Sequence, residues 1–371
     1  MNVDALERVV ADVAAGAIDV DAAASFPVRN VEALREAGFL GLTSSADVGG
    51  GGGGMADAAM VIEQLAGACG STAMVMLMHY AANAVLEAHG SEAVRREVGA
   101  GHHLTTLAFS EVGSRSHFWV PSGTAKAQGE HVRLDAKKSW VTSARDATSY
   151  VWSSRPLSGD GPMTLWLVPA RAAGLEPGGP FDGLGLRGNG SIPVTATGVL
   201  VDRDAQLGDD GAGLDVALAT ALPWFLVLSA AFGLGLMEAV TAETGQHLST
   251  TRLEHLDIAL IGQPIVRTDH ARMRITTDGA RAFLSDTLAA LGEGRADATL
   301  RVLESKALVA ESTIDVTDLA MKLCGGAAFR KELGVERRFR DARAARVMAP
   351  TTDTLLDFIG RAISGMPLLD A

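Results

Sequence analysis

The sequence predicts an α+β protein of several domains, in which a β-rich segment lies between two helical segments. Three observations support this fold class. Apolar residues recur at helical spacing towards both ends of the chain, short apolar runs separated by turn residues fill the middle, and helices do not alternate with strands as they do in a doubly wound sheet. We place the domains at residues 1–103 (helical), 104–207 (β) and 208–371 (helical bundle).

The N-terminal domain is predicted from helical periodicity. Apolar side chains between Met55 and Ala66 lie on one helix face, and Ser71–His89 is rich in Ala, Met and Leu. An earlier helix is predicted around Val31–Ala37. The run Gly49–Gly54 separates it from the others, and we expect a flexible loop there because glycine loses the most backbone entropy on folding.

The middle domain is predicted to be all-β. Turn signals at Gly159–Pro162 and Gly178–Pro180 separate short apolar runs of strand length. The runs are Leu104–Phe109, Val132–Leu134, Trp140–Thr142, Tyr150–Ser153, Met163–Val168 and Val194–Val201.

Helical periodicity returns in the C-terminal domain. The predicted helices are Gly213–Leu248, Arg267–Leu291, Leu300–Leu323 and Asp353–Ile363. The most apolar stretch, Phe225–Met237, is shorter than the roughly 20 residues that span a bilayer. We therefore expect a buried helix and no membrane span.

Composition excludes several classes of protein. The 371 residues are 47% hydrophobic, and the net charge of −12 argues against nucleic-acid binding, which depends on cationic contacts to phosphate. The two cysteines, Cys69 and Cys324, are too few for a disulfide scaffold or a structural zinc site and fit a cytoplasmic location. The N-terminus lacks a secretory signal pattern. The adjacent His102 and His103 diverge on any regular element, so we expect no metal site.

Four segments combine small polar residues, glycines or charges, and each has an ordinary structural explanation when taken alone. A tryptophan such as Trp140 is usually a core residue, Gly325-Gly326 is a common helix stop, and the cluster Arg337–Arg343 is typical of a solvated or salt-bridged face. The order of all four segments along the chain nevertheless favours a role in ligand binding or catalysis. The segments are Ala108–Ser116, Lys138–Ser143, Met321–Phe329 and Val335–Arg343, the last followed by Met348–Thr352.

Several short motifs occur in a characteristic order. They are Phe26-Pro27 with Gly41 and Gly49–Gly53, Ser110-Glu111-Val112-Gly113-Ser114-Arg115-Ser116, Trp140-Val141-Thr142, Gly262-Gln263-Pro264-Ile265, Cys324-Gly325-Gly326 and Arg340-Asp341-Ala342. From about Phe26 to its end, the chain resembles the acyl-CoA dehydrogenase superfamily of flavoproteins. The resemblance implies an N-terminal helical domain, a middle β-barrel domain and a C-terminal four-helix bundle.

The resemblance also implies FAD, bound between the middle domain and the C-terminal helices. Ser110 and Ser116 would lie near the isoalloxazine and ribityl chain, Trp140 against the ring, and Thr142 at its N5 edge. Gly325 and Gly326 would approach the adenine-side phosphates from a neighbouring subunit of a homo-oligomer, a dimer or tetramer. Thr351 would be a further contact.

The chain departs from the family at the catalytic base. The family's dehydrogenases carry a Y-E-G-T run after R-D-A, and counting on from Arg340 places Ala349 at the glutamate. Some members carry the base on an earlier helix, at a position near Phe225 here. Neither side chain accepts a proton, although the backbone N–H of Ala349 remains available to a thioester carbonyl. Losing a general base typically costs about 10²–10⁴-fold in rate.

A second departure concerns cofactor retention. The family's arginine before F-G-x-P-I, which contacts the FAD pyrophosphate, is replaced by Ile258 or Ala259. Arg252 or Arg267 is a possible substitute, and Lys322 replaces a usual glutamine and adds a positive charge.

Two side chains are candidates for a relocated base. Asp353 follows Ala349 by one helical turn, and His79 belongs to a helix that would form a wall of the substrate pocket. Their ordinary alternatives are a helix-start carboxylate and a packed core histidine.

Three functions remain open. The first is an FAD-dependent oxidoreductase acting on the CH–CH group of an acyl thioester linked to CoA or a carrier protein, with electron-transfer flavoprotein as acceptor. The second is a flavin-dependent monooxygenase using molecular oxygen, in which no base is needed. The third is a non-catalytic subunit paired with a homologous, base-bearing chain.

Overall fold

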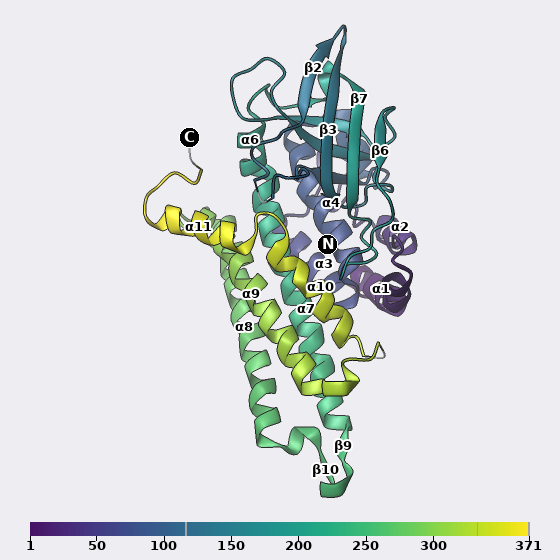
Figure 1. Cartoon of the computed structure of the whole chain (residues 1–371), viewed down its shortest axis with the longest axis vertical. Coiled ribbons are helices and arrows are strands. Elements are labelled where there is room, and N and C mark those ends of the chain that lie inside the picture. The colour runs from purple at the N-terminus through teal and green to yellow at the C-terminus, as the bar shows by residue number, and fades with distance from the viewer. Residues whose placement is uncertain (116, 332, 370–371) are drawn as a thin grey trace.

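The computed structural model describes residues 1–115, 117–331 and 333–369. The β domain lies at one end of the molecule, the N-terminal helices lie beside it, and the long helices extend away from it (Figure 1). The predicted order of helical, β and helical segments is confirmed.

The N-terminal helices surround one almost completely buried helix, α4 (Gly70–His89). Its neighbours are α1 (Val3–Ala23), α2 (Val28–Glu36), α3 (Met55–Ala68) and α5 (Glu92–Gly99), with a short 3₁₀ turn at Ala46–Val48. Helices α3 and α4 carry the predicted apolar faces.

The glycine run does not form the expected flexible loop. Gly51 N donates to Gly41 O at 2.9 Å and Gly53 N to Leu42 O at 2.8 Å, so the run folds back onto the preceding turn. A Cβ at Gly50 would lie 2.3 Å from Ser44 O. The glycines therefore allow two backbone segments to approach closely.

The middle domain consists of two four-stranded sheets. The first has the order β1 (Thr105–Ala108), β4 (Ser149–Ser154), β5 (Thr164–Pro169), β8 (Gln206–Leu207), and the second β2 (Thr124–Gln128), β3 (His131–Val141), β7 (Ile192–Asp202), β6 (Leu175–Pro177). Tyr150, Trp152 and Trp166 face the second sheet, whereas the alternate residue Val151 joins the core of the helices. The first sheet is thus buried on both faces and attaches the β domain to the helices.

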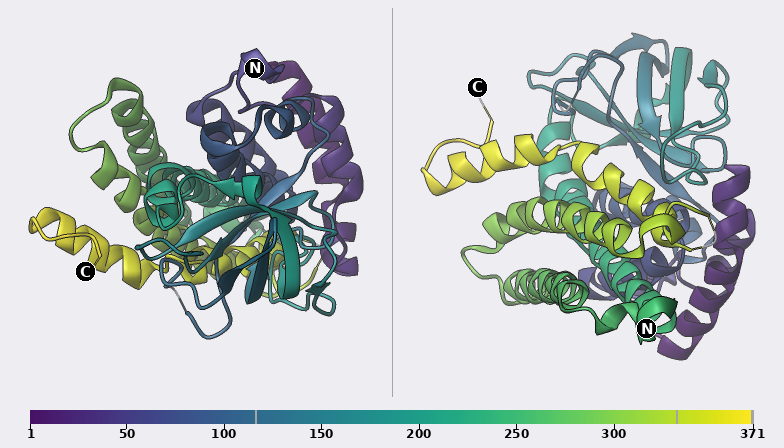
Figure 2. Two further views of the ribbon diagram at one scale, coloured as in Figure 1. Left: turned by 90° about the horizontal axis from the view of Figure 1, so that it is seen from above. Right: turned by 60° about the horizontal axis from the view of Figure 1, so that its bottom comes forward.

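The C-terminal domain is a bundle in which α7, α8, α9 and α10 pack against one another (Figures 1 and 2). A π-helical turn, Ala217–Ala221, joins the short α6 to α7. The bounds are α6 (Gly213–Val216), α7 (Leu222–Thr250), β9 (Arg252–Leu253), β10 (Ile258–Ala259), α8 (Pro264–Glu293), α9 (Ala298–Cys324), α10 (Val335–Val347) and α11 (Thr352–Ile363).

The continuous helical stretch Gly213–Thr250 is long and apolar enough to cross a membrane by length and composition alone. However, 72% of its apolar window is buried inside the protein, and every residue from Phe225 to Met237 is buried. This burial confirms the predicted buried helix. The stretch meets the length and composition criteria because the core helix of a protein can satisfy them as well as a membrane span does.

The arginine cluster on α10 forms salt bridges within its own domain and to the N-terminal domain. Arg340 pairs with Asp21 of α1 at 2.6 Å, and Arg338 pairs with Glu243 of α7 at 2.7 Å. These pairs attach α10, and the segment that follows it, to both helical domains.

Asp210 gives a prediction for acid stability. It accepts hydrogen bonds from the N–H groups of Leu157, Ser158 and Gly159 and from Thr164 Oγ1, at 2.6–2.8 Å. Burial opposes ionisation, but these bonds lower the pKa of Asp210 to about 2. A lowered folded-state pKa stabilises the fold above the unfolded pKa near 4, and this stabilisation is lost as the pH falls towards 2.

We therefore expect Asp210→Asn to lower the free energy of unfolding by about 1–2 kcal/mol at pH 7 and by progressively less below pH 4. Urea titrations of both proteins at a series of pH values measure the difference. A difference that does not change with pH would contradict this assignment.

Candidate active site

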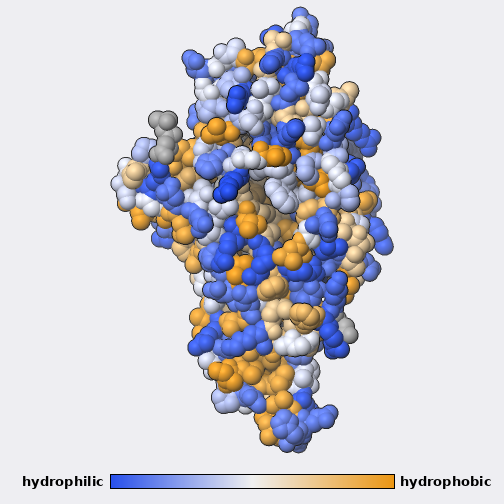
Figure 3. Space-filling view, viewed as in Figure 1, coloured by the Kyte–Doolittle hydropathy of each residue, from blue (hydrophilic) through white to orange (hydrophobic). Residues whose placement is uncertain are grey.

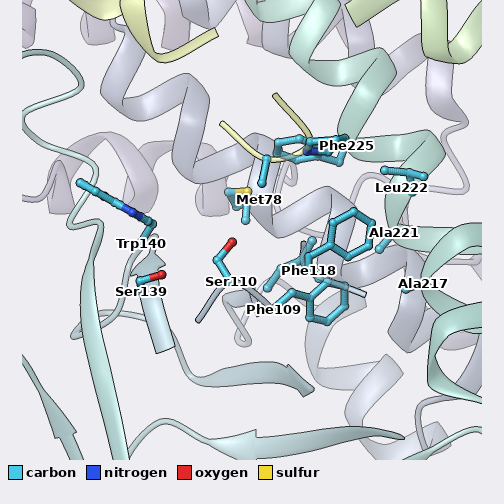
Figure 4. A pocket seen from close by; sticks show the side chains of 13 residues that line it. Met78, Phe109, Ser110, Phe118, Ser139, Trp140, Ala217, Ala221, Leu222 and Phe225 are labelled. Atoms are coloured by element: carbon cyan, nitrogen blue, oxygen red, sulfur yellow. The ribbon is translucent and has the colours of Figure 1, made fainter. Parts of the chain in front are cut away.

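A pocket lies where the β domain, α4 and the start of α7 meet, and the segment after α10 closes one side of it. The pocket encloses about 530 Å³, including the part open to solvent. Figure 3 shows the molecular surface hollowed between the β domain and the helices, and Figure 4 shows the lining side chains. They are Met78, Leu107, Phe109, Ser110, Phe118, Ser139, Trp140, Ala217, Ala221, Leu222, Phe225, Ala349 and Pro350.

Trp140 is a large aromatic residue held at the surface by an unusual backbone. The pairing of β3 with β7 is irregular between Lys138 and Val141, and Trp140 adopts φ 56° within this irregularity. A left-handed conformation costs an L-residue roughly 1–2 kcal/mol. The side chain remains 68% exposed. The bulge thus presents an indole ring at the pocket mouth instead of burying it, contrary to the common role of tryptophan.

Two serines, Ser110 and Ser139, line the same pocket as Trp140 (Figure 4). Ser139 N donates to Ser110 O at 2.9 Å, which joins the segment after β1 to β3. Phe109 and Phe118 lie deeper in the pocket, and their rings stack with centroids 6.5 Å apart. The pocket therefore has a polar edge at Ser110 and Ser139 and an apolar floor.

A buried ion pair joins Glu111 and Lys138, the chain neighbours of Ser110 and Ser139. Lys138 Nζ lies 2.7 Å from Glu111 Oε1, and the two side chains are 0% and 2% exposed. Glu111 also accepts from Ser122 N at 2.6 Å, and Lys138 also donates to Ser153 O at 2.7 Å. Burial alone would raise the pKa of Glu111, but Lys138 and the hydrogen bonds hold it below its usual value. Each charge is fully partnered, so the pair fixes the positions of its two chain neighbours.

Thr142 does not line the pocket in this chain. It is buried, and its Oγ1 lies 2.9 Å from Ser191 Oγ. Thr351 is the N-cap of α11, where its hydroxyl accepts from Thr354 N at 3.4 Å. Ser116 lies outside the described residues.

The two positions predicted from the sequence for the family's base, Ala349 and Phe225, line the same pocket. They come from segments more than a hundred residues apart, and both carry apolar side chains. Among the described lining residues, none has a carboxylate, imidazole or amine. The pocket as described therefore holds no general base.

Neither candidate for a relocated base reaches this pocket, so both predictions are corrected. His79 is completely buried, with Nε2 lying 2.8 Å from Leu40 O and Nδ1 accepting from Thr105 N at 3.2 Å. Desolvation lowers its pKa to about 4. Its neighbour Met78 faces the pocket instead. Asp353 is exposed in the first turn of α11, where a carboxylate favours the helix dipole, and it is not a lining residue.

The residues expected at the adenine side lie at the other end of the bundle. Arg252 belongs to β9 and bonds Asp257 Oδ1 at 2.6 Å, far from the β domain (Figure 1). Lys322 pairs with Asp269 at 2.7 Å near the start of α8. Gly325 and Gly326 end α9 beside it, with open space around both. A single chain does not bring these residues together with Trp140.

Sequence reasoning did not predict several of the lining residues, and three of them illustrate why. Phe118 and Met78 carry no motif, and only the close packing of their segments brings them to the pocket. Ser139 lies within the same irregularity of β3 that exposes Trp140, between Lys138 and Val141. Its position next to Trp140 in the sequence was the signal that could have identified it.

The three-domain order and the pocket where the domains meet agree with the family models, which identify the chain as a flavoprotein oxidoreductase. Residues 1–101, 106–199 and 211–364 match the N-terminal, middle and C-terminal domain models of acyl-CoA dehydrogenase. The chain belongs to the acyl-CoA dehydrogenase family and is an enzyme of that family.

Individual relatives differ in their reactions. The chain is 28% identical over 370 residues to the amino sugar nitrososynthase DnmZ of Streptomyces peucetius, covering 94% of this chain and 88% of that protein. It is 24% identical over 350 residues to the short-chain specific acyl-CoA dehydrogenase of Bos taurus, covering 91% and 82%. Butyryl-CoA dehydrogenase from Megasphaera elsdenii shares the fold, with a TM-score of 0.90, 19% identity and 97% coverage of both chains.

Proposed function

We propose that this protein binds FAD with the isoalloxazine ring against Trp140, and that it acts on a substrate held in the apolar pocket below. The exposed indole supports this placement, because such a ring offers a flat stacking surface that the chain keeps exposed despite backbone strain. Ser110 and Ser139 add hydroxyl groups at the ring's edge. When bound, FAD supplies the redox chemistry, while the protein orients the reactants and excludes water.

The adenine half of FAD is proposed to contact a second copy of the chain. Arg252, Lys322, Gly325 and Gly326 lie together at the end of the bundle opposite Trp140, where they are accessible to another subunit. Glycines with open space around them allow a phosphate close to the backbone. We therefore propose a homo-oligomer, a dimer or tetramer. The free, buried thiols of Cys69 and Cys324 are consistent with a cytoplasmic setting.

Within this frame, oxygenation is the reaction that the pocket supports best. The observation that carries it is the convergence of Ala349 and Phe225 on one pocket, so that both base positions of the family are apolar. Dehydrogenation of a thioester needs the α-proton removed, whereas a substrate oxygenated by reduced flavin and molecular oxygen needs no carboxylate there. The similarity to a nitrososynthase favours the same chemistry.

Dehydrogenation of an acyl thioester is the second candidate. The similarity to short-chain acyl-CoA dehydrogenase favours it, and Ala349 keeps its backbone N–H beside the pocket. It requires a substrate whose α-proton is already acidic, with the electrons passing to an electron-transfer flavoprotein.

One experiment separates these candidates. The purified full-length protein is first loaded with FAD and its visible spectrum recorded. It is then mixed anaerobically with a panel of acyl-CoA thioesters, and separately reduced with dithionite and mixed with labelled dioxygen and candidate amines or thioesters. Oxygenation predicts no bleaching by thioesters and a product carrying one labelled oxygen atom. Rapid bleaching by a thioester would instead establish dehydrogenation. A protein that retains no flavin after incubation with FAD and removal of the unbound cofactor would refute both.

Trp140→Gly should separate folding from cofactor binding. Glycine adopts φ 56° without strain, so we expect the free energy of unfolding of the FAD-free protein to rise by about 1 kcal/mol or stay unchanged. Loss of the stacking surface should weaken FAD binding by about 5- to 150-fold, as stacking contributes about 1–3 kcal/mol. Thermal melts and FAD titration measure the two effects. FAD affinity equal to that of the wild type would remove Trp140 from the site.

A further inference from the structure

A second buried lysine, Lys306 of α9, lies directly behind the pocket wall. It is 1% exposed, and its Nζ donates to three main-chain carbonyl oxygens: Ala345 O at 3.3 Å, Met348 O at 3.1 Å and Pro350 O at 2.9 Å. An ammonium group has three N–H donors and no acceptor. The three donors therefore match the three carbonyls.

These acceptors belong to the end of α10 and to the segment that lines the pocket. Helix α10 ends at Val347, which leaves its last carbonyls without helical partners. The same Nζ lies 6.0 Å from the ring centroid of Phe225, so Lys306 is adjacent to both pocket-lining positions of the family's alternative bases. Pro350 and Ala349 reach the pocket from the segment that Lys306 holds.

A lysine is a costly residue at this place. Burial lowers the pKa of Lys306 to about 7, and an apolar side chain of similar length avoids the desolvation of a charge. Its presence calls for an explanation other than core packing. The carbonyl contacts supply one, because no apolar side chain can bond three main-chain oxygens at once.

We propose that Lys306 is a positioning residue that fixes the wall segment, residues 348–350, against the reaction pocket. The proposal rests on the proposed function in one respect, namely that this pocket is where the substrate binds. The ammonium acts as a buried cap for α10 and holds Ala349 at the pocket surface. Without it, the wall segment opens locally while the bundle remains folded.

The test uses a thiol reporter on the wall segment. The full chain carrying Ala349→Cys is labelled with iodoacetamide, and mass spectrometry follows the rate. Cys69 and Cys324 are both buried, and the parent chain without the reporter measures their contribution. The reporter is then combined with Lys306→Met, or with the matched control Thr313→Val, which alters a buried hydroxyl of the same helix that bonds Val309 O. Each variant is labelled at the same interval below its own unfolding midpoint.

We expect labelling at position 349 to be about tenfold faster with Lys306→Met and within about twofold of the parent with Thr313→Val. Equal rates in the two variants would overturn the proposal. If Lys306→Met does not fold, Lys306→Gln replaces it. Its shorter side chain loses the carbonyl contacts at smaller cost, and a rate equal to the parent's would overturn the proposal as well.

A second measurement separates this inference from the proposed function. In proteins without the reporter, Lys306→Met should shift the visible absorption band of bound FAD, and Thr313→Val should leave it unchanged. An unshifted band in Lys306→Met would mean that the wall segment held by Lys306 does not border the proposed flavin site, and it would overturn the inference that this wall belongs to the reaction pocket. If no variant binds FAD, the proposed function fails, and the labelling contrast alone decides whether Lys306 holds the wall.

Discussion

Ala349→Glu is expected to raise the rate at which an acyl thioester reduces the bound FAD. The substitution places a carboxylate on a pocket-lining position, next to Pro350 in the chain and in the same pocket as Phe225. A positioned general base typically contributes about 10²–10⁴-fold to the step in which a proton is removed. Anaerobic bleaching of bound FAD by short-chain acyl-CoA should therefore accelerate by about that factor. Stopped-flow absorbance measures it.

Ala349→Gln is the matched control, since it has nearly the same shape and cannot accept the proton as a carboxylate does. We expect no acceleration from it. Acceleration by both variants would mean that the added bulk, not the base, changes the rate. If wild-type FAD is already bleached as fast as in Ala349→Glu, the pocket contains a functional base that its described lining does not reveal.

Lys138→Met is expected to destabilise the protein by about 3–5 kcal/mol, because it leaves the Glu111 carboxylate buried without its partner. The Glu111 side chain is 2% exposed, so the carboxylate has little access to bulk water. The loss should grow as the pH rises from the unfolded-state pKa of glutamate, about 4.3, towards the raised pKa of the unpaired Glu111 carboxyl, since the ionised form is the costly one. Chemical denaturation at pH 5 and pH 8 measures it. The segment that carries Ser110 and Ser139 should lose its fixed geometry, so FAD retention falls too.

The double variant Glu111→Gln/Lys138→Met tests whether the charge is the cause. Replacing both partners removes the buried charge, so the double variant should recover most of the lost stability, and a double-mutant cycle gives the coupling energy. A double variant as unstable as Lys138→Met alone would assign the loss to packing around Trp152, whose ring lies 5.1 Å from Lys138 Nζ.

The long periodic segments were predictable from sequence. The apolar run at Phe225–Met237 was assigned to a buried helix because it is too short for a membrane span, and the structure confirms it. Strand β2 (Thr124–Gln128) was missed because it is short and mostly polar, and α10 because its arginines obscure an apolar stripe. In both elements, contacts with the rest of the fold decide the secondary structure against the local sequence pattern.

The site was only partly predictable. Trp140, Ser110 and Ala349 were singled out by motif, and the structure places all three on one pocket. His79 was the opposite case. A histidine on a pocket-forming helix resembles a base in sequence, but one residue along a helix turns a side chain by about 100°. That rotation puts Met78 in the pocket and His79 in the core.

The distance between Trp140 and the Arg252–Lys322 end of the bundle has a genetic consequence. If each cofactor is shared by two copies, a chain defective at one end still offers an intact opposite end to its neighbour. Two inactive alleles, one changed at Trp140 and one at Gly325, should then complement each other when co-expressed, because mixed assemblies contain some sites built entirely from unaltered halves.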